Sequence, residues 1–599
     1  MNVASIFADM PGDRPCLLFE GGISSYADVR ARAAGVRARL QAEGVGRGDF
    51  VALVLPNGPD FVAGYLGVLS LGAVAVCINP MLAAAETAFI LADSGCRLAL
   101  AEGEVAGWLS LGGLRVLDVA TATAPGASPR ASPGIWAVED VPDRHPAVVV
   151  YSSGTSGRPK GVMLSHGNVA FTARSKVRYM GVTGADRLLL FLPLHHCFGQ
   201  NAILWPALFA GACVVLQRRF DRAAVLQALR TEGVTMVFGV PTTFLALEGR
   251  ITPADGPRVR YWFSAAAPLP LEVEERWHRH MGLPIHQGYG QSECSPFATY
   301  NHLHDLRRGK VGTAIDGVDL RIVDPADGRD LPPGEAGEIV LRGPNVMLGY
   351  LNRPDDTAKA VRQGWLHTGD IGRLDAEGYL SVEDRLTDLI IVGGRNVYPA
   401  EVENALYAHP AVAEVAVYGV ADPFLGEEVW ANVVLKPGAD AGAQELEAIC
   451  RRTLAAYKVP TAFAFVDALP RNPTGKILKR ELRAAARPAA QDPSHRERGG
   501  DAGGLEGSGL DGSGLETFVR SWLGDHLNLA PDTIERDRAF AEYGLDSVLG
   551  VALARELAAP LGRAVDLTVV WEASTLAGLL ARLREPVAAA GACAVPAAT

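Results

Sequence analysis

The sequence lacks paired cysteines, an excess of positive charge and any long apolar run. Its eight cysteines are scattered and form no Cys-x-x-Cys pair, which argues against zinc sites and disulfide frameworks and fits a reducing cytoplasm. The net charge of -11 disfavours nucleic acid as a main partner, because phosphate backbones are bound by basic surfaces. The longest apolar run, residues 202–216, is broken by Pro206 and Gly211 and is shorter than the ~20 residues of a membrane span. It predicts a buried helix leading into a strand. The N-terminal residues lack the basic start and apolar core of a signal peptide, so none is expected.

The composition is ordinary for a protein with a real core, with 48% hydrophobic and 21% charged residues over 599 positions. At about 150 residues each, a chain of this length suggests roughly three to five domains. Residues 17–145 alternate strand-like and helix-like segments, with Ser25 as the expected cap of the first helix. Such alternation predicts a wound parallel or mixed α/β sheet.

A glycine-rich loop, residues 151–162, follows an apolar, β-branched segment that is typical of a buried strand. Its glycines allow sharp turns, while its hydroxyl groups and two cations, Arg158 and Lys160, add donors and positive charge. That combination suits a polyphosphate. The loop is not a Walker A motif, because Arg158-Pro159 separates Gly157 from Lys160. On composition alone, a flexible surface linker is the alternative interpretation.

Further segments place polar residues next to apolar stretches, at 192–199, 261–269, 287–293, 364–370 and 383–388. Taken singly, each is as typical of a turn, a strand end or a solvated charge as of a ligand site. The adjacent histidines His195 and His196, for example, would serve equally well as satisfied polar residues at a helix start.

Beyond residue 388 the sequence changes character twice. Residues 389–485 have the pattern of a small α+β unit, and the glycine-rich stretch that follows predicts a flexible linker. Residues 515–585 show helical apolar spacing, with a last helix over about 571–583 capped at Ser574. Asp546-Ser547 at the start of a helix could be a simple cap.

These segments occur in the order found in the adenylate-forming superfamily, which residues 1–485 resemble. The superfamily comprises acyl- and aryl-CoA ligases, luciferases and the adenylation domains of peptide synthetases. Residues 515–585 resemble an acyl or peptidyl carrier domain. The resemblance implies an α/β fold, a large multi-subdomain N-terminal adenylation domain with a small α+β lid, followed by an all-α four-helix carrier domain. The implied boundaries are 1–386 for the N-terminal domain, 387–485 for the lid, 486–514 for the linker, 515–585 for the carrier and 586–599 for a tail.

The resemblance also implies roles for individual residues. ATP or AMP would be bound by Ser152, Ser153, Gly154, Thr155, Ser156, Gly157, Lys160, Ala266, Ala267, Pro268, Tyr289, Gly290, Ser292, Asp370, Arg385 and Lys476. The acid would lie against His196, Phe198, Ala265 and Gly288, and Glu293 would hold Mg²⁺, a cation that prefers carboxylate ligands. Lys476 and His196 would be catalytic. Thr387 would be the hinge, Gly393 and Gly394 would line the pantetheine tunnel, and Ser547 would carry a covalent 4′-phosphopantetheine.

Three departures from the superfamily's usual pattern bear on substrate and motion. Domains that select α-amino acids carry an Asp near residues 196–198 to pair with the substrate ammonium, and this sequence has none there. A buried ammonium without a counter-charge is costly, so a fatty or aryl acid is expected instead. Glycine commonly stands where this chain has Ala265 or Ala266, and Asp or Lys where it has Thr387.

The expected activity is ATP-dependent activation of the acid as acyl-AMP, followed by transfer to the phosphopantetheine thiol of the chain's own carrier. One alternative is an acyl-CoA ligase that releases acyl-CoA. Another, from a different class, is a catalytically silent docking scaffold for the carrier. Expected partners are the carboxylic acid, a phosphopantetheinyl transferase, and downstream synthase or condensation enzymes of secondary-metabolite or lipid assembly. No nucleic acid and no membrane span are expected.

Overall fold

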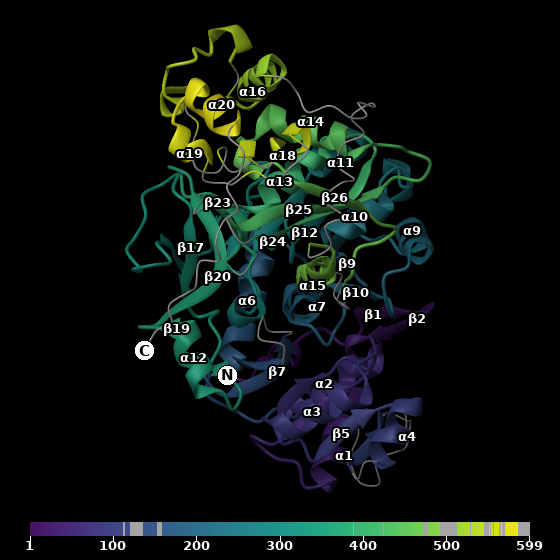
Figure 1. Cartoon of the computed structure of the whole chain (residues 1–599). Helices are drawn as coiled ribbons and strands as arrows, with labels where there is room; N and C mark the ends of the chain where they lie inside the picture. The colour runs from purple at the N-terminus through teal and green to yellow at the C-terminus, as the bar shows by residue number, and fades with distance from the viewer. Residues whose placement is uncertain are drawn as a thin grey trace, which may run out of the picture. The chain divides into compact units, whose positions relative to one another are not determined.

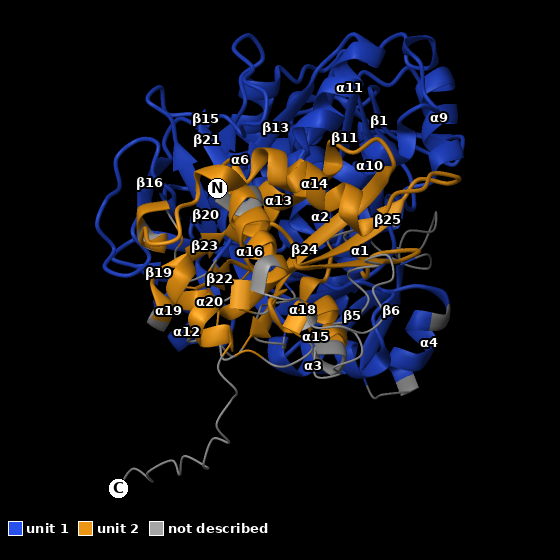
Figure 2. Ribbon diagram, turned by 45° about the horizontal axis from the view of Figure 1, so that its top comes forward, with its two compact units in different colours: residues 1–387, 471–476 blue, residues 388–470, 477–599 orange. Residues whose placement is uncertain are grey.

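The computed structural model describes residues 1–111, 114–119, 136–152, 159–386, 388–393, 395–422, 425–471, 477–490, 512–527, 529–543, 545, 550, 553–554, 556–561, 565 and 569–584. The chain forms two compact units, residues 1–387 with 471–476 and residues 388–470 with 477–599 (Figure 2). Within the described ranges, no helix has the length and hydrophobicity needed to cross a membrane.

A seven-stranded sheet carries the N-terminal part of the first unit. Its spatial order is β18 (Gly349–Tyr350), β8 (Lys160–Ser165), β7 (Pro146–Ser152), β4 (Val74–Cys77), β3 (Phe50–Val54), β5 (Leu98–Ala101) and β6 (Arg115–Asp118). The five strands from β7 to β6 run parallel. Between β3 and β6 the chain alternates strands with α2 (Pro59–Ser70), α3 (Ala84–Ser94) and α4 (Gly103–Leu111), which gather around β5 in Figure 1. The wound sheet predicted from the alternation is therefore confirmed.

Strands β7 and β8 are antiparallel neighbours near the end of this sheet opposite β6. In the sequence, they precede and follow the glycine-rich loop. Their register places Ser152 opposite Lys160. The central strands are buried along nearly their whole length, which explains their continuous apolar sequence.

A nine-stranded sheet forms the second layer of the first unit. Its order is β15 (Thr313–Ala314), β14 (Thr299–Tyr300), β13 (Ile285–Tyr289), β12 (Tyr261–Ser264), β11 (Met236–Gly239), β9 (Arg187–Leu190), β10 (Cys213–Leu216), β1 (Pro15–Phe19) and β2 (Gly22–Ser25). The strands from β13 to β1 are parallel. The associated helices are α8 (Trp205–Ala210), α9 (Arg222–Thr231), α10 (Pro241–Leu247) and α11 (Leu271–Met281). Buried α8 leads directly into β10, as the apolar run at 202–216 predicted.

A third, antiparallel sheet completes the unit. It consists of β16 (Asp319–Val323), β17 (Gly337–Arg342), β20 (Trp365–Leu374) and β19 (Val361–Arg362), with β21 (Leu380–Arg385) paired to β20, and α12 (Pro354–Ala360) precedes β19. The β20–β21 register sets Asp370 directly opposite Arg385. This pairing holds Asp370 and Arg385 side by side, although both are far from the glycine-rich loop in sequence.

Helix caps follow the sequence closely in the first unit. Ser25 caps α1 (Tyr26–Ala42), because its Oγ accepts a hydrogen bond from Asp28 N at 3.1 Å, as expected for a capping box. Ser165 caps α6 (His166–Met180) in the same way, through Asn168. The face of α6 that packs into the core recurs every three to four residues through Val169, Ala173 and Lys176.

The second unit contains a five-stranded sheet and a separate group of helices. The sheet order is β23 (Arg395–Val397), β22 (Ile390–Val392), β25 (Gly426–Leu435) and β24 (Val412–Asp422), with β26 (Ala462–Phe465) paired to β25. It accompanies α13 (Pro399–Tyr407), α14 (Ala443–Thr453) and α15 (Lys479–Ala490). Helices α16 (Gly512–Leu527), α18 (Ala558–Leu561), α19 (Val569–Ala573) and α20 (Leu576–Arg584) enclose an apolar core of their own.

The predicted cap of the last helix is corrected by the structure. The segment forms two helices, α19 and α20, and Ser574 between them has a left-handed φ of 54°. Thr575 caps α20 instead, because its Oγ1 accepts a hydrogen bond from Gly578 N at 3.1 Å.

Candidate active site

A buried carboxylate, Asp370, is the centre of the first cluster. Tyr289 OH donates to its Oδ2 at 2.6 Å, and Gln291 Nε2 donates to the same atom at 3.3 Å. Arg385 Nε lies 3.2 Å from Oδ1. Burial and the neighbouring Asp370 hold the pKa of Tyr289 well above its usual value, so its hydroxyl stays a donor. A carboxylate has about four acceptor sites, so Asp370 is held rigidly with capacity for a further donor.

Glu293 is the centre of the second cluster. Its Oε1 accepts a hydrogen bond from Tyr350 OH at 2.9 Å, and its backbone oxygen accepts one from Met347 N at 2.9 Å. Lys160 lies on the Tyr350 ring, with Nζ 5.2 Å from the centroid and 3.2 Å from Asp356 Oδ2. Burial raises the pKa of the Glu293 carboxyl, which makes a nearby cation favourable.

The donor set around Glu293 fits Mg²⁺ better than a transition metal. Over the described ranges, no group of three or more His, Cys, Asp or Glu side chains is arranged to hold a metal ion. A single carboxylate is nevertheless the ligation that Mg²⁺ accepts when phosphate oxygens and water complete its shell. Glu293 therefore suits a magnesium ion that arrives with a nucleotide.

The histidine segment forms the third part of the site. His196 caps the short helix α7 (Cys197–Gly199), with Phe198 N donating to His196 Nδ1 at 3.2 Å. Burial lowers the pKa of His196 to about 4, so the ring is neutral near pH 7. Because Nδ1 accepts, the proton is assigned to Nε2, which is left as a donor. The π-helix Gln200–Leu204 follows directly, a feature frequent at functional sites.

Packing joins this segment to the strands β12 and β13. The rings of Phe198 and Phe263 meet edge to face, with centroids 6.3 Å apart. Cys197 Sγ lies 3.1 Å from Ser292 Oγ. A Cβ at Gly288 would stand 2.9 Å from Thr299 O and 3.1 Å from Phe263 Cζ, so this glycine lets the Phe263 ring approach the strand.

The turn after β12 carries the predicted residues Ala265, Ala266, Ala267 and Pro268. Ala266 has a φ of +72°, a left-handed conformation that costs a non-glycine residue roughly 1–2 kcal/mol. That backbone explains why glycine would be favoured at this position. Ala267 and Pro268 are exposed, and Ser264 is paired with Gln287, so the turn emerges beside Gly288.

The remaining predicted residues are distributed as follows. Gly290 lies where a Cβ would stand 2.4 Å from Pro296 O. In the second unit, Gly393 has a φ of +56° and donates its N–H to Leu425 O at 2.7 Å. Ser153, Gly154, Thr155, Ser156, Gly157, Thr387, Gly394, Lys476 and Ser547 lie outside the described residues.

Three residues that contact these clusters were not predicted from the sequence. Gln291 stands inside a recognised motif, and its side chain also donates to Thr368 O at 3.0 Å. Tyr350 and Asp356 carry no local signal and become visible only through their contacts with Glu293 and Lys160. Outside these clusters, Lys176 interrupts the buried face of α6, a pattern that is also visible in the sequence.

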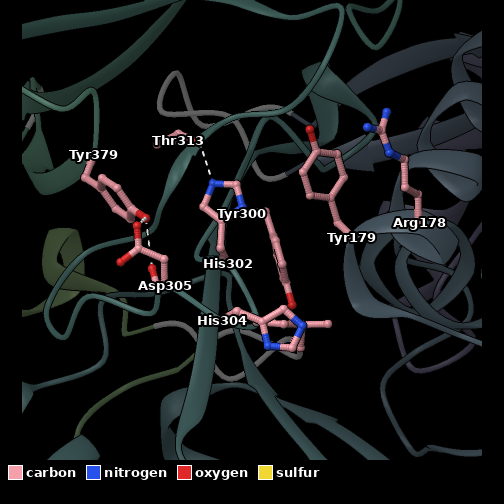
Figure 3. Close-up of a pocket in the computed structure, with 9 residues that line it drawn as sticks. Arg178, Tyr179, Tyr300, His302, His304, Asp305, Thr313 and Tyr379 are labelled. Atoms are coloured by element: carbon pink, nitrogen blue, oxygen red, sulfur yellow. Dashed lines mark hydrogen bonds between the residues drawn. The ribbon is translucent and has the colours of Figure 1, made fainter.

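A surface pocket of about 630 Å³ lies elsewhere in the first unit and is lined by none of the predicted residues (Figure 3). Two pairs of polar side chains in its lining interact with each other. His302 Nε2 lies 2.7 Å from Thr313 Oγ1, and Tyr379 OH donates to Asp305 Oδ2 at 2.8 Å.

The three sheets and the clusters at Asp370 and Glu293 define an adenylate-forming enzyme. Three family models match the chain: AMP-binding enzyme over residues 6–351, AMP-binding enzyme C-terminal domain over 401–476, and phosphopantetheine attachment site over 517–583. The chain belongs to the AMP-binding enzyme family and carries a C-terminal phosphopantetheine attachment domain.

The chain matches individual relatives over most of their length. The chain is 39% identical over 474 residues to feruloyl-CoA synthase from Amycolatopsis sp, which covers 77% of this chain and 94% of that protein. It is 37% identical over 478 residues to 2-succinylbenzoate–CoA ligase from Bacillus velezensis, covering 79% and 96%. The ATP-bound structure of MatB from Rhodopseudomonas palustris superposes with a TM-score of 0.76 at 32% identity, covering 81% and 98%. MenE from Bacillus subtilis, in complex with ATP and magnesium ion, gives 0.71 at 34%, covering 80% and 99%.

These matches confirm the predicted family and fold class. The protein is a mixed α/β adenylate-forming enzyme with a small C-terminal domain, followed by a helical carrier. Its adenylating region is like that of ligases for acyl and aryl acids. A phosphopantetheine attachment domain implies a phosphopantetheinyl transferase as a partner.

Proposed function

We propose that this enzyme activates a fatty or aryl acid as acyl-AMP and loads it onto the phosphopantetheine thiol of its own carrier domain. The observation that carries the proposal is the presence of an adenylation region and a phosphopantetheine attachment domain in a single chain. We assign residues 1–386 to the catalytic domain, 387–485 to the lid, 486–514 to the linker and 515–585 to the carrier.

In the first step, the acid's carboxylate oxygen attacks the α-phosphorus of ATP, and the bond to pyrophosphate breaks. Asp370 would accept hydrogen bonds from the ribose hydroxyls, supported by Tyr289, Gln291 and Arg385. Donors from residues 152–160 and Lys476 would offset negative charge on the phosphate oxygens, which is the electrostatic part of the catalysis. Glu293 would hold Mg²⁺, which neutralises phosphate charge when bound.

The acid would bind between the His196–Phe198 segment and the end of β13 at Gly288. His196, neutral and protonated at Nε2, is suited to donate a hydrogen bond to an oxygen of the acid or the phosphate. The rings of Phe198 and Phe263 offer an apolar wall. No aspartate stands at residues 192–199 to pair with an α-ammonium, which supports an acid without an α-amino group.

In the second step, a thiol attacks the carbonyl carbon of the acyl-AMP and AMP leaves. A swing of the lid about Thr387 would remove Lys476 and bring the pantetheine arm past Gly393 and Gly394. Ser547 would carry that arm. Tethering raises the effective thiol concentration to around millimolar for a flexible linker, which favours transfer within one chain.

Release of acyl-CoA is the second candidate function. The names of the relatives favour it, since feruloyl-CoA synthase and 2-succinylbenzoate–CoA ligase are named for free CoA. In that case the carrier domain would serve another enzyme. A silent docking scaffold is disfavoured, because the polar clusters at Asp370 and Glu293 are intact.

The test is intact-protein mass spectrometry of the phosphopantetheinylated enzyme with ATP and a panel of acids. We expect one acid to add its acyl mass to Ser547, with no increment in Ser547→Ala. Adding free CoA then separates the two functions: acyl-CoA formed faster than the loaded carrier would support the CoA ligase. No increment and no acyl-CoA across a broad panel would refute both.

Replacing Lys476 tests the assignment of the catalytic lysine. Lys476→Ala should reduce ATP–pyrophosphate exchange about 10²-fold or more, because charge on the phosphate oxygens loses its counter-cation. Lys479→Ala is the matched control. Exchange that persists unchanged in Lys476→Ala would contradict the assignment.

Localisation and downstream partners are further parts of the proposal. Seven cysteines among the described residues are free, which supports a cytoplasmic enzyme. The acyl-carrier product would be consumed by a synthase or condensation enzyme of secondary-metabolite or lipid assembly.

A further inference from the structure

Lys176 is a buried lysine on the core face of α6. Its relative exposure is 1%, and the helix places it in line with the buried residues Val169, Ala173 and Met180. Lysines are almost never buried to this degree unless they are paired. The two arginines nearest to it on the helix, Arg174 and Arg178, lie outside this buried face. Lys176 therefore occupies a position where an apolar residue would ordinarily pack.

The surroundings of the Lys176 amino group are aromatic. Its Nζ lies 3.8 Å from the ring centroid of Phe297 and 4.9 Å from that of Phe263. Throughout the described ranges, no carboxylate forms an ion pair with it and no hydrogen bond is made to its Nζ. Burial holds the pKa of Lys176 well below its usual value, with only the Cys197 thiol acting in the opposite direction. Cation–π contacts are worth about 2 kcal/mol when desolvated, less than the cost of burying an unpaired ammonium.

The aromatic wall that touches Lys176 also bounds the proposed acid pocket. Phe263 packs edge to face on Phe198, and its Cζ approaches Gly288 so closely that a Cβ there would stand 3.1 Å away. One ring thus has the Lys176 amino group on one side and the proposed acid-binding residues at its edge. An acid lying along this wall would bring its far end toward the amino group.

We propose that Lys176 is a specificity-determining residue that binds an oxygen atom carried by the acid remote from its reacting carboxylate. The substrate class is thereby narrowed to acids bearing a phenol, an alcohol or a second carboxylate, and it excludes plain alkyl and unsubstituted aryl acids as best substrates. This inference rests on the proposed function, because it assumes that the acid binds beside Phe198 and Gly288.

The chemistry of an amine supports an oxygen partner in either protonation state. A neutral amine donates N–H to an oxygen and accepts from a phenol O–H, and an ammonium pairs with a carboxylate. An alkyl end would leave the buried amino group without a hydrogen-bond partner from the acid, and an ammonium-bearing acid would place a second amine beside it. Sites built to hydrogen-bond a substrate hydroxyl reject analogues that lack it far more strongly than apolar pockets reject an extra methylene.

The experiment compares acids that differ by one oxygen-bearing group, using ATP–pyrophosphate exchange with the full-length enzyme. One set is cinnamate, 4-hydroxycinnamate and 4-carboxycinnamate, and the other is octanoate, 8-hydroxyoctanoate and octanedioate. The two arms distinguish a hydroxyl from a carboxylate partner, and an aryl from an alkyl chain. The readout is the ratio of kcat/KM for each oxygen-bearing acid to that of its plain parent.

We expect the wild-type ratio to exceed about ten for at least one oxygen-bearing acid, and Lys176→Met to lower that ratio at least about tenfold. Lys176→Gln, which keeps a hydrogen-bond donor, should retain part of the preference. Lys359→Met on exposed α12 is the control and should keep the wild-type ratio. Lys176→Met should also unfold at the same or a higher temperature, because it removes a buried unpaired amine.

Two results would overturn the inference while leaving the proposed function in place. The first is wild-type exchange that favours the plain acids. The second is a Lys176→Met enzyme whose kcat/KM falls by the same factor for every acid, with a lower unfolding temperature, as expected of a lysine that only fills space. If Lys176→Met does not fold, the same kcat/KM ratios and unfolding temperature are measured for Lys176→Gln. Absence of exchange with every acid would refute the proposed function and this inference together.

Discussion

The proposed nucleotide end and the proposed acid end of the candidate site differ in how their buried polar groups are paired. At the nucleotide end, Asp370 is surrounded by partners, with Tyr289, Gln291 and Arg385 all within hydrogen-bond or ion-pair distance. At the acid end, Lys176 is also deeply buried, but within the described ranges its amino group has no ion-pair partner and lies against the rings of Phe263 and Phe297.

The difference indicates what each end has to recognise. A carboxylate fixed by several donors is preorganised, and it presents the same acceptor to every nucleotide. A buried amine without a partner is costly until a ligand supplies one, so it discriminates among ligands. In this enzyme the nucleotide, which is always the same, would meet a completed hydrogen-bond network. The acid, which differs among such enzymes, would meet an amine that still needs a partner.

Glu293→Gln should produce the largest effect at the nucleotide end. The substitution keeps the shape of the side chain and its hydrogen bond to Tyr350 but removes the negative charge that suits Mg²⁺. We expect the kcat of ATP–pyrophosphate exchange to fall about 10²-fold, with a higher Mg²⁺ concentration needed for half-maximal rate. Glu272→Gln, at a partly exposed position of α11, is the control. An unchanged Mg²⁺ dependence would remove Glu293 from the metal site.

Asp370→Asn should have the next largest effect. It retains the size of the side chain but loses a charged acceptor worth about 1.5–3 kcal/mol, so the KM for ATP should rise about 10- to 100-fold. The KM for the acid should change far less. Asp319→Asn, whose carboxylate pairs with Arg342 at the surface, is the matched control. Equal changes in both KM values would show that Asp370 does not act at the nucleotide end alone.

Gly288→Ala tests the acid end by narrowing it. The added Cβ would stand 2.9 Å from Thr299 O and 3.1 Å from Phe263 Cζ, so the ring must shift. Overpacking of this kind costs about 1–3 kcal/mol, and we expect kcat/KM for the preferred acid to fall roughly tenfold, with the KM for ATP within about twofold. Gly107→Ala has no atom within 4 Å of its new Cβ and serves as the control. A rise in the KM for ATP as large as the loss for the acid would contradict the separation of the two ends.

The sequence indicates the residues of the proposed nucleotide end more directly than those of the proposed acid end, and the reason is physical. Tyr289, Ser292 and Glu293 follow one another within a short segment, and Asp370 and Arg385 come from strands that a β pairing sets side by side. Local motifs of this kind can be recognised in the sequence without knowledge of the fold. Tyr350 has no such local motif, because it lies beside Glu293 only in the folded chain, where β18 pairs with β8.

The same limit applies to the sheets and to Lys176. Strand β1 pairs with β10 although about 200 residues separate them, and nothing in the local sequence of either strand indicates its neighbour. Lys176 carried a signal, since it falls on the apolar face of a periodic helix. The spacing does not show that Phe263 and Phe297, from two other segments, close around it.

Glu274 provides the smallest and sharpest test of the idea that an incompletely paired buried group is either functional or costly. It lies on α11, with 1% relative exposure. Its Oε2 accepts from Gln287 Nε2 at 3.0 Å and Gly309 N at 3.2 Å, while its Oε1 has no hydrogen-bond partner among the described residues. Burial raises the pKa of Glu274 to about 7.

Because this pKa is higher in the folded than in the unfolded state, the folded protein binds more protons between about pH 4.5 and 7, and its stability falls as pH rises through that window. Glu274→Gln cannot ionise and should escape this loss. We expect its apparent free energy of unfolding in urea, relative to wild type, to be about 1–2 kcal/mol more favourable at pH 8 than at pH 4.5. Glu275→Gln, on the same helix, should show no such pH-dependent gain. A Glu274→Gln enzyme equally destabilised at both pH values would mean that the carboxylate is satisfied after all, and that incomplete pairing alone does not mark a costly group in this fold.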